Sequence, residues 1–167
     1  MSRARKLLIT GGLGLALWGM SYGLWYAVWV EHQTLDAMGG NLAGAFVHAA
    51  EGRMPAAHAA LDAYAATAFD YARQVDVHSH WIGLAMLLIV LGVVFDRVGF
   101  DAGKQMGLAV ALVIGSAIFP LGVVLQTVVK GALADGLAIV GAGLVIAGLA
   151  GVAVGFAGLK MGNFSGT

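Results

Sequence analysis

The sequence predicts an all-α integral membrane protein, a four-helix bundle with an extracytoplasmic helical segment between its first and second membrane helices. The chain of 167 residues is 60% hydrophobic and 11% charged, whereas a soluble domain usually carries about 25% charged residues. Four apolar runs reach the roughly 18 residues that indicate a membrane span. The sequence shows none of the alternating ten-residue segments of a membrane barrel. We therefore expect one membrane domain, residues 1–167, whose spans are all helices.

The first span is expected at residues 7–30. Arg3, Arg5 and Lys6 precede it as in a signal peptide, but an apolar run of about 24 residues exceeds the 7–15 of a cleavable signal, so we expect a retained anchor. An aromatic row on one side of this helix contains Trp18, Tyr22, Trp25 and Trp29. These rings form either a belt at the membrane boundary or the wall of a site for a planar cofactor or an apolar substrate.

The segment 31–77 is expected to be helical with one break. Gly39-Gly40 predicts a flexible interruption, after which Asn41 would cap a short helix, residues 42–51. Gly52 should end that helix, and Pro55 suits the start of the next one.

The next helix is expected to continue into the second span. Apolar positions recur at helical spacing, at Leu61, Tyr64, Ala68, Tyr71, Val75, His78 and Ile82. This pattern predicts one long helix, or two helices bent near Asp76, with His78 on the buried side.

The remaining spans are expected at residues 79–95, 106–128 and 137–159. Paired glycines four residues apart allow membrane helices to approach closely; they are Gly19 and Gly23, Gly103 and Gly107, and Gly151 and Gly155. Because four helices leave faces uncovered, we expect a homo-oligomer.

Basic residues predict the orientation in the cell membrane, because they are enriched on the cytoplasmic side. With both termini cytoplasmic, the inner side holds Arg3, Arg5, Lys6, Arg97, Lys104 and Lys160, and the outer side holds Arg53, Arg73 and Lys130. Segment 31–77 is then extracytoplasmic, and the outer side also holds every histidine: His32, His48, His58, His78 and His80. The net charge of zero gives no support for a nucleic-acid partner.

The histidines are the main candidates for binding chemistry. The chain has no cysteine, which excludes disulfides, thiolate ligands and covalently attached c-type heme. His78 and His80 lie about 200° apart on a regular helix, so they are poorly placed to bind one metal ion together. A b-type heme needs one neutral imidazole on its iron and an apolar slot.

Residues 70–130 resemble the styrene oxide isomerase family. The resemblance is carried by His78-Ser79 at the start of the second span, and by Gly99-Phe100 and Lys104 on the cytoplasmic side. It implies a four-helix membrane protein that binds heme b through His78 and forms trimers with heme between subunits. It also implies isomerisation of an epoxide to a carbonyl compound.

Two positions depart from the family pattern. The family asparagine six residues after the histidine is Leu84 here, and the tyrosine of the third helix is Val123. In the family these side chains orient the epoxide and its product. The resemblance therefore implies heme binding more directly than it implies the reaction.

The leading hypothesis is a heme enzyme that acts on a small apolar substrate. His78 would ligate the iron, and the heme contacts would be Trp18, Trp25, Tyr71 and Met86. Polar or proton-handling catalytic groups would be His80, Gln126 and Tyr22. Gln126 is a polar residue inside a span, which indicates either function or a hydrogen bond between helices.

Three alternatives remain open. The first is an electron-transfer or gas-binding heme subunit, in which His80 or His32 serves a second heme or a sixth coordination position. The second is a zinc, copper or iron site without heme, with ligands drawn from Glu31, His32, Asp76, His78 and His80. The third is an accessory subunit without a cofactor.

Overall fold

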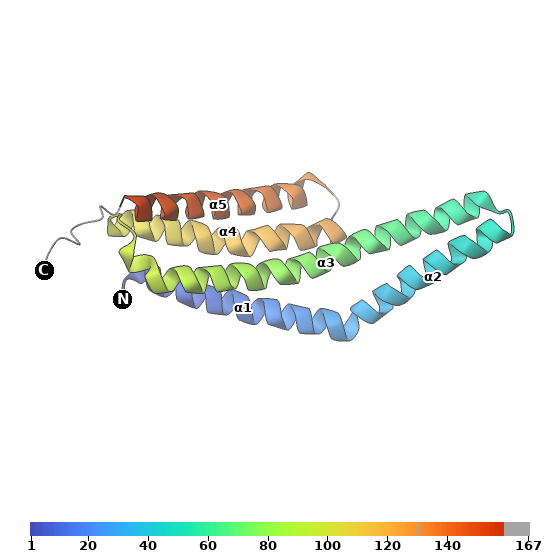
Figure 1. Ribbon diagram of the computed structural model, residues 1–167, viewed down its shortest axis with the longest axis horizontal. Helices are drawn as coiled ribbons and strands as arrows, with labels where there is room; N and C mark the ends of the chain where they lie inside the picture. Colours follow the sequence, from blue (N-terminus) through green and yellow to red (C-terminus); the bar gives the residue numbers. More distant parts are fainter. Residues whose placement is uncertain (130, 159–167) are drawn as a thin grey trace, which may run out of the picture.

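The structure, a computed structural model, describes residues 1–129 and 131–158. The described chain contains no strand. It consists of α1 (Arg3–Trp29), α2 (Glu31–Ala50), α3 (Met54–Val94), the short 3-10 helix η1 (Phe95–Arg97), α4 (Ala102–Val128) and α5 (Ala132–Ala157) (Figure 1). The prediction of an all-helical chain is confirmed.

Four helical segments are long and apolar enough to cross a membrane: α1, α3 together with η1, α4 and α5. They contain nearly all of the predicted spans, so a multi-pass membrane protein is supported. Leu159, the last residue of the predicted fourth span, lies outside the described residues. Side-chain caps start two of the helices, because the backbone N–H of Arg5 donates to Ser2 Oγ and that of Lys104 donates to Asp101 Oδ1.

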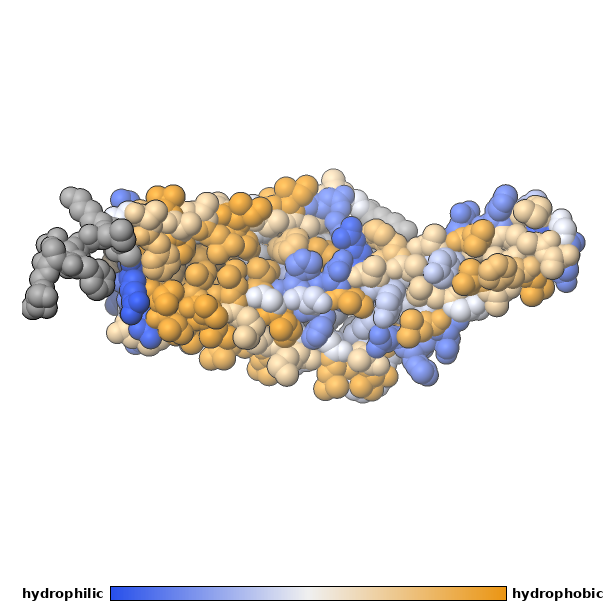
Figure 2. Space-filling view, in the orientation of Figure 1, coloured by the Kyte–Doolittle hydropathy of each residue, from blue (hydrophilic) through white to orange (hydrophobic). Residues whose placement is uncertain are grey.

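The spans pack as a bundle in which α1 lies against α3 and α4 lies against α5 (Figure 1). One buried cluster lies toward the end of the bundle where α1 begins and α5 ends; it contains Ala4, Leu8, Leu88, Phe95, Val98, Ala109, Leu112 and Val152. A second cluster lies toward the other end and contains Val77, Trp81, Val123 and Ala138. Apolar side chains dominate the surface between the two ends of the bundle, as a lipid-facing surface requires (Figure 2).

Five basic residues lie near helix ends at the end of the bundle where α1 and α4 begin: Arg3, Arg5, Lys6, Arg97 and Lys104. There Arg5 Nη1 lies 3.2 Å from Asp96 Oδ2 and ties the start of α1 to η1. Lys130 and Lys160 lie outside the described residues. The orientation with cytoplasmic termini and an extracytoplasmic segment 31–77 stays a prediction.

A helical hairpin, formed by α2 and residues 54–77 of α3, extends beyond α4 and α5 (Figure 1). The break predicted at Gly39-Gly40 is wrong, because α2 runs unbroken from Glu31 to Ala50. Each glycine in an exposed helix costs about 1 kcal/mol relative to alanine, and packing of α2 along α3 outweighs that cost.

The other boundaries of the hairpin follow the sequence. Gly52 ends α2 with a φ of +73°, a left-handed conformation that favours glycine. Pro55 lies in the first turn of α3. α3 is one continuous helix of 41 residues, the first of the two arrangements that the sequence allowed.

Glycines allow close contacts between neighbouring helices, as predicted, but only at two of the three predicted glycine pairs. A Cβ atom placed on Gly19, Gly23, Gly151 or Gly155 would lie closer than 3.0 Å to a side chain of a neighbouring helix or loop. A Cβ atom on Gly107 would meet nothing within 4 Å, so the Gly103–Gly107 pair makes no close helix contact within one chain. The packed stripe of α5 is Ala134, Ala138, Gly141, Val145, Gly148, Val152 and Gly155.

Candidate functional site

His78 is seated on the backbone of α1. Its Nδ1 lies 2.9 Å from the carbonyl oxygen of Gly19, and a Cβ atom on Gly23 would overlap the imidazole ring. A carbonyl oxygen can only accept, so Nδ1 carries a proton and donates it. The absence of side chains at Gly19 and Gly23 therefore fixes the ring so that, in its neutral form, the lone pair is on Nε2, where it can act as a ligand.

His80 is held differently. Its Nδ1 lies 2.6 Å from the carbonyl oxygen of Asp76 in the preceding turn of α3, and its ring meets Phe119 of α4 edge to face, with centroids 4.8 Å apart. The same reasoning places the lone pair of the neutral His80 ring on Nε2. His78 thus faces α1 and His80 faces α4, as the 200° separation predicted.

The packed face of α3 differs from the predicted stripe by one position. From residue 77 onward the buried residues are Val77, Trp81, Ala85, Leu88 and Gly92; Ala57, near the start of α3, is also buried. Leu61 and Val75 of the predicted stripe are exposed. His78 is half-buried at the edge of the packed face. A membrane helix is apolar on all sides, so hydropathy alone does not locate its packed face.

The aromatic residues of α1 form a groove beside α3. Trp18, Tyr22 and Trp25, together with Ser21, line an apolar cavity of about 250 Å³. The ring of Trp81 lies 5.1 Å from that of Tyr22 and 6.1 Å from that of Trp18, measured between centroids. The outer wall is open, because Trp18 is 59% exposed and Trp25 is 49% exposed. Tyr22 Oη is buried and has no hydrogen-bond partner within the described residues.

His78 and this groove lie on different sides of α1. Trp18 precedes Gly19 and lies about 100° from it around the helix, and Trp25 lies about 200° from Gly23. His78 contacts the glycine side. A single chain therefore does not bring the predicted iron ligand onto the predicted tryptophan contacts.

The other predicted heme contacts are also dispersed. Met86, two turns along α3 from His78, is 57% exposed on the apolar surface. Tyr71 lies in the hairpin, where its hydroxyl donates to Glu31 Oε1 at 3.1 Å. That hydrogen bond and the negative charge of Glu31 raise the pKa of Tyr71 above its usual value.

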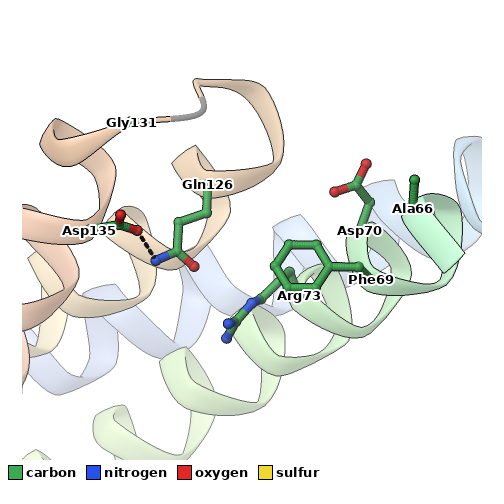
Figure 3. Close-up of a pocket in the computed structure, with 7 residues that line it drawn as sticks. All are labelled: Ala66, Phe69, Asp70, Arg73, Gln126, Gly131 and Asp135. Carbon is green, nitrogen blue, oxygen red and sulfur yellow. Dashed lines mark hydrogen bonds between the residues drawn. The ribbon is translucent and has the colours of Figure 1, made fainter. Parts of the chain in front are cut away.

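Gln126 makes the hydrogen bond between helices that was the alternative to a catalytic role. Its Nε2 donates to Asp135 Oδ1 of α5 at 2.8 Å. Both residues line an open cavity of about 360 Å³ to which α3 contributes Phe69, Asp70 and Arg73 (Figure 3). Arg73 lies over the ring of Phe69, at 5.0 Å from its centroid.

The ligands suggested for a metal site without heme do not gather. Within residues 1–129 and 131–158, no group of three or more His, Asp or Glu side chains is arranged to hold a metal ion. Glu31 is bonded to Tyr71, and Asp76 contributes its backbone carbonyl to His80. His78 and His80 face different helices.

A polar pocket that was not predicted from the sequence lies where α1 runs into α2. We call it the tyrosine pocket; it is lined by Tyr26, Val30, Thr34, Asp70, Tyr71, Gln74 and Thr127. Gln74 Nε2 donates to Thr127 Oγ1 at 2.9 Å and joins α3 to α4 there. The available signal was the set of tyrosine, glutamine and threonine side chains near the predicted ends of three spans, some just inside a span and some just outside it.

Comparison of the chain with protein families, with curated proteins and with solved structures found no match.

Proposed function

We propose that the protein is an integral membrane b-type heme protein in which His78 supplies the axial ligand. One observation carries the proposal: the Nδ1 proton of His78 is donated to the Gly19 carbonyl, which places the lone pair of the neutral ring on Nε2. Histidines that bind metals usually donate their other ring N–H to a carbonyl or a carboxylate, which fixes the tautomer and the ring orientation.

The residues present fit a heme that is shared between copies of the chain. His78 would provide the ligand from one copy, and Trp18 and Trp25 of a neighbouring copy would provide a flat apolar wall. Both tryptophans are exposed on the membrane-facing surface of α1, where another copy can reach them. The resemblance to styrene oxide isomerases implies a trimer.

The proposed activity is a heme-dependent conversion of a small apolar substrate, in the manner of an epoxide isomerase. A heme with one histidine ligand supplies a Lewis-acidic centre with an open position that polarises a substrate oxygen. The open groove along α1 admits a substrate from the lipid. His80 Nε2 and the unpartnered hydroxyl of Tyr22 are the proposed proton-handling groups. Gln126, already bonded to Asp135, is omitted from this set.

The test is the absorption spectrum of protein purified in mild detergent. We expect a Soret band in the wild type that is lost in His78→Ala and retained in His58→Ala, a matched change in the hairpin. A Soret band that survives His78→Ala unchanged would contradict the assignment. Absence of the band in the wild type, even after reconstitution with hemin, would contradict the whole proposal.

His80 supports a second candidate, an electron-transfer or gas-binding heme subunit. The bond from its Nδ1 to the Asp76 carbonyl places the lone pair of the neutral ring on Nε2, so it is a second imidazole that could bind iron. A low-spin, six-coordinate spectrum that becomes high-spin in His80→Ala would select this candidate. A high-spin wild-type spectrum that shifts on addition of an epoxide would select the enzyme.

A further inference from the structure

A cavity with an arginine in its wall opens at the end of the bundle where α1 and α4 begin. We call it the basal cavity; its volume is about 470 Å³, and the starts of both helices line it, with Arg3, Gly103 and Met106 among the lining residues. Arg3 is exposed, and it is the only charged residue among the described residues that line the cavity. This volume lies in the range of about 300–1,000 Å³ that is usual for ligand sites, and the arginine favours an anionic ligand.

The acidic residues at this end of the bundle do not neutralise Arg3. There are two of them in the described helices, and each is paired with another basic residue: Asp96 Oδ2 lies 3.2 Å from Arg5 Nη1, and Asp101 Oδ2 lies 3.2 Å from Lys104 Nζ. The other carboxylate oxygen of Asp101 accepts from the backbone N–H of Lys104. Both carboxylates are therefore engaged by their own partners.

Three cationic side chains remain at this end: Arg3, Lys6 and Arg97. None of them makes an ion pair within residues 1–129 and 131–158, and the sequence of residues 159–167 contains no Asp or Glu. All three residues are exposed, so an anion can reach them. Arg3 and Lys6 are three residues apart on α1 and therefore share one face of the helix. This end of the bundle thus carries an excess of three accessible positive charges.

The basal cavity lies where the apolar surface of the bundle ends. In Figure 2 a hydrophilic band closes the apolar surface at the end where α1 begins. Next to the cavity, Val110 of α4 is 38% exposed, one turn beyond Met106. A Cβ atom on Gly107 would meet nothing within 4 Å, so the surface of α4 beside the cavity has room for an acyl chain.

A ligand that fits this arrangement carries a negative charge at one end and an apolar chain at the other. Basic pockets between membrane helices bind the headgroups of anionic lipids in this way. We propose that the basal cavity binds the headgroup phosphate of an anionic phospholipid. Arg3 contacts the phosphate, Lys6 and Arg97 contribute attraction at longer range, and the acyl chains lie along α4. This inference rests on the proposed membrane location of the helices and not on the heme.

The test compares phosphatidylglycerol with phosphatidylcholine of the same acyl chains, because the two headgroups differ in net charge. The full-length protein in detergent is titrated with each lipid, and native mass spectrometry gives the fraction of protein that carries a bound lipid. Each basic residue near an anionic headgroup contributes about fivefold in affinity, so phosphatidylglycerol should bind at least about tenfold more tightly than phosphatidylcholine. Arg3→Gln should weaken phosphatidylglycerol binding about fivefold. Arg3→Lys, which keeps the charge, should bind nearly as wild type does, and Arg73→Gln, the same change on the hairpin side, should have no effect.

A second variant, Lys6→Gln, should weaken phosphatidylglycerol binding in the same direction. If wild type binds the two lipids equally, or if Arg3→Gln and Lys6→Gln both bind phosphatidylglycerol as Arg73→Gln does, the proposal is overturned. Soluble glycerol 3-phosphate at the concentration of the lipid should not displace phosphatidylglycerol; displacement would assign the cavity to a soluble phosphate and would also overturn the proposal. His78→Ala should bind phosphatidylglycerol as wild type does, so failure of the heme proposal and failure of this one are distinguishable.

Discussion

The packing of the His78 ring against Gly19 and Gly23 of α1 leads to a specific prediction for Gly23→Ala. A Cβ atom at this position would lie 3.1 Å from His78 Cγ and closer than 3.0 Å to Cε1 and Nδ1, whereas unstrained carbon contacts are about 3.5–4.0 Å. The ring must therefore retreat by at least about 0.5 Å. That movement stretches the 2.9 Å bond from Nδ1 to the Gly19 carbonyl beyond the usual limit of about 3.2 Å.

Overpacking supplies most of the expected cost. Inserting a methyl group into a packed interface costs about 1–3 kcal/mol, and a hydrogen bond between membrane helices contributes about 0.6 kcal/mol on average. We expect Gly23→Ala to lower the free energy of unfolding by about 2 kcal/mol. Gly14→Ala is the matched control in the same helix, because a Cβ atom there meets nothing within 4 Å.

Two measurements check this prediction. Unfolding in mixed micelles gives the change in stability, and nitrogen NMR of labelled histidine gives the tautomer of His78, with a His78→Asn sample to assign its signals. Wild type should show a protonated Nδ1, and Gly23→Ala should show a mixture of tautomers. If Gly23→Ala equals Gly14→Ala in stability and leaves the His78 signals unmoved, the packing of His78 on α1 is wrong.

Three further predictions follow from the fold. Gly39→Ala should stabilise the hairpin by up to about 1 kcal/mol, measured by thermal unfolding, because its Cβ atom meets open space in an exposed helix. Gly141→Ala should cost more than Gly23→Ala in the same assay, because its Cβ atom would overlap the α4 backbone, which cannot rotate away. The Ser2 hydroxyl and the Arg5 guanidinium lower the pKa of Asp96, so the stability they provide is present above the unfolded pKa of about 4 and is lost as pH falls through the lower folded pKa. Acid titration should show this loss in wild type and a smaller one in Asp96→Asn.

The features predicted correctly depend on local chemistry. Helices long and apolar enough to cross a membrane follow from the length and hydropathy of a run, and the end of α2 at Gly52 and the start of α3 near Pro55 follow from backbone preferences of single residues. The break at Gly39-Gly40 was wrong because contact with α3, the next helix of the hairpin, outweighs a local preference. A sequence reading cannot weigh that contact before the pairing of helices is known.

The packed faces of the membrane helices were harder to predict for a physical reason. Apolar residues are equally stable against lipid and against another helix, so they do not report which side is packed. Small residues do report it, and on α5 they recur every seven residues at Gly141, Gly148 and Gly155. That repeat was visible in the sequence and was a better guide than the pairs four residues apart.

In the candidate site, too, one part was predictable from the sequence and the other depended on contacts between helices. His78 was visible as a polar residue beside a span, but what fixes its tautomer is a bare carbonyl at Gly19 and an empty position at Gly23. Neither glycine carries a functional group, so a search for reactive side chains passes over both. A site of this kind is specified by where α1 omits side chains as much as by the imidazole on α3. Variants of the glycines therefore test the assignment of His78 without removing the histidine itself.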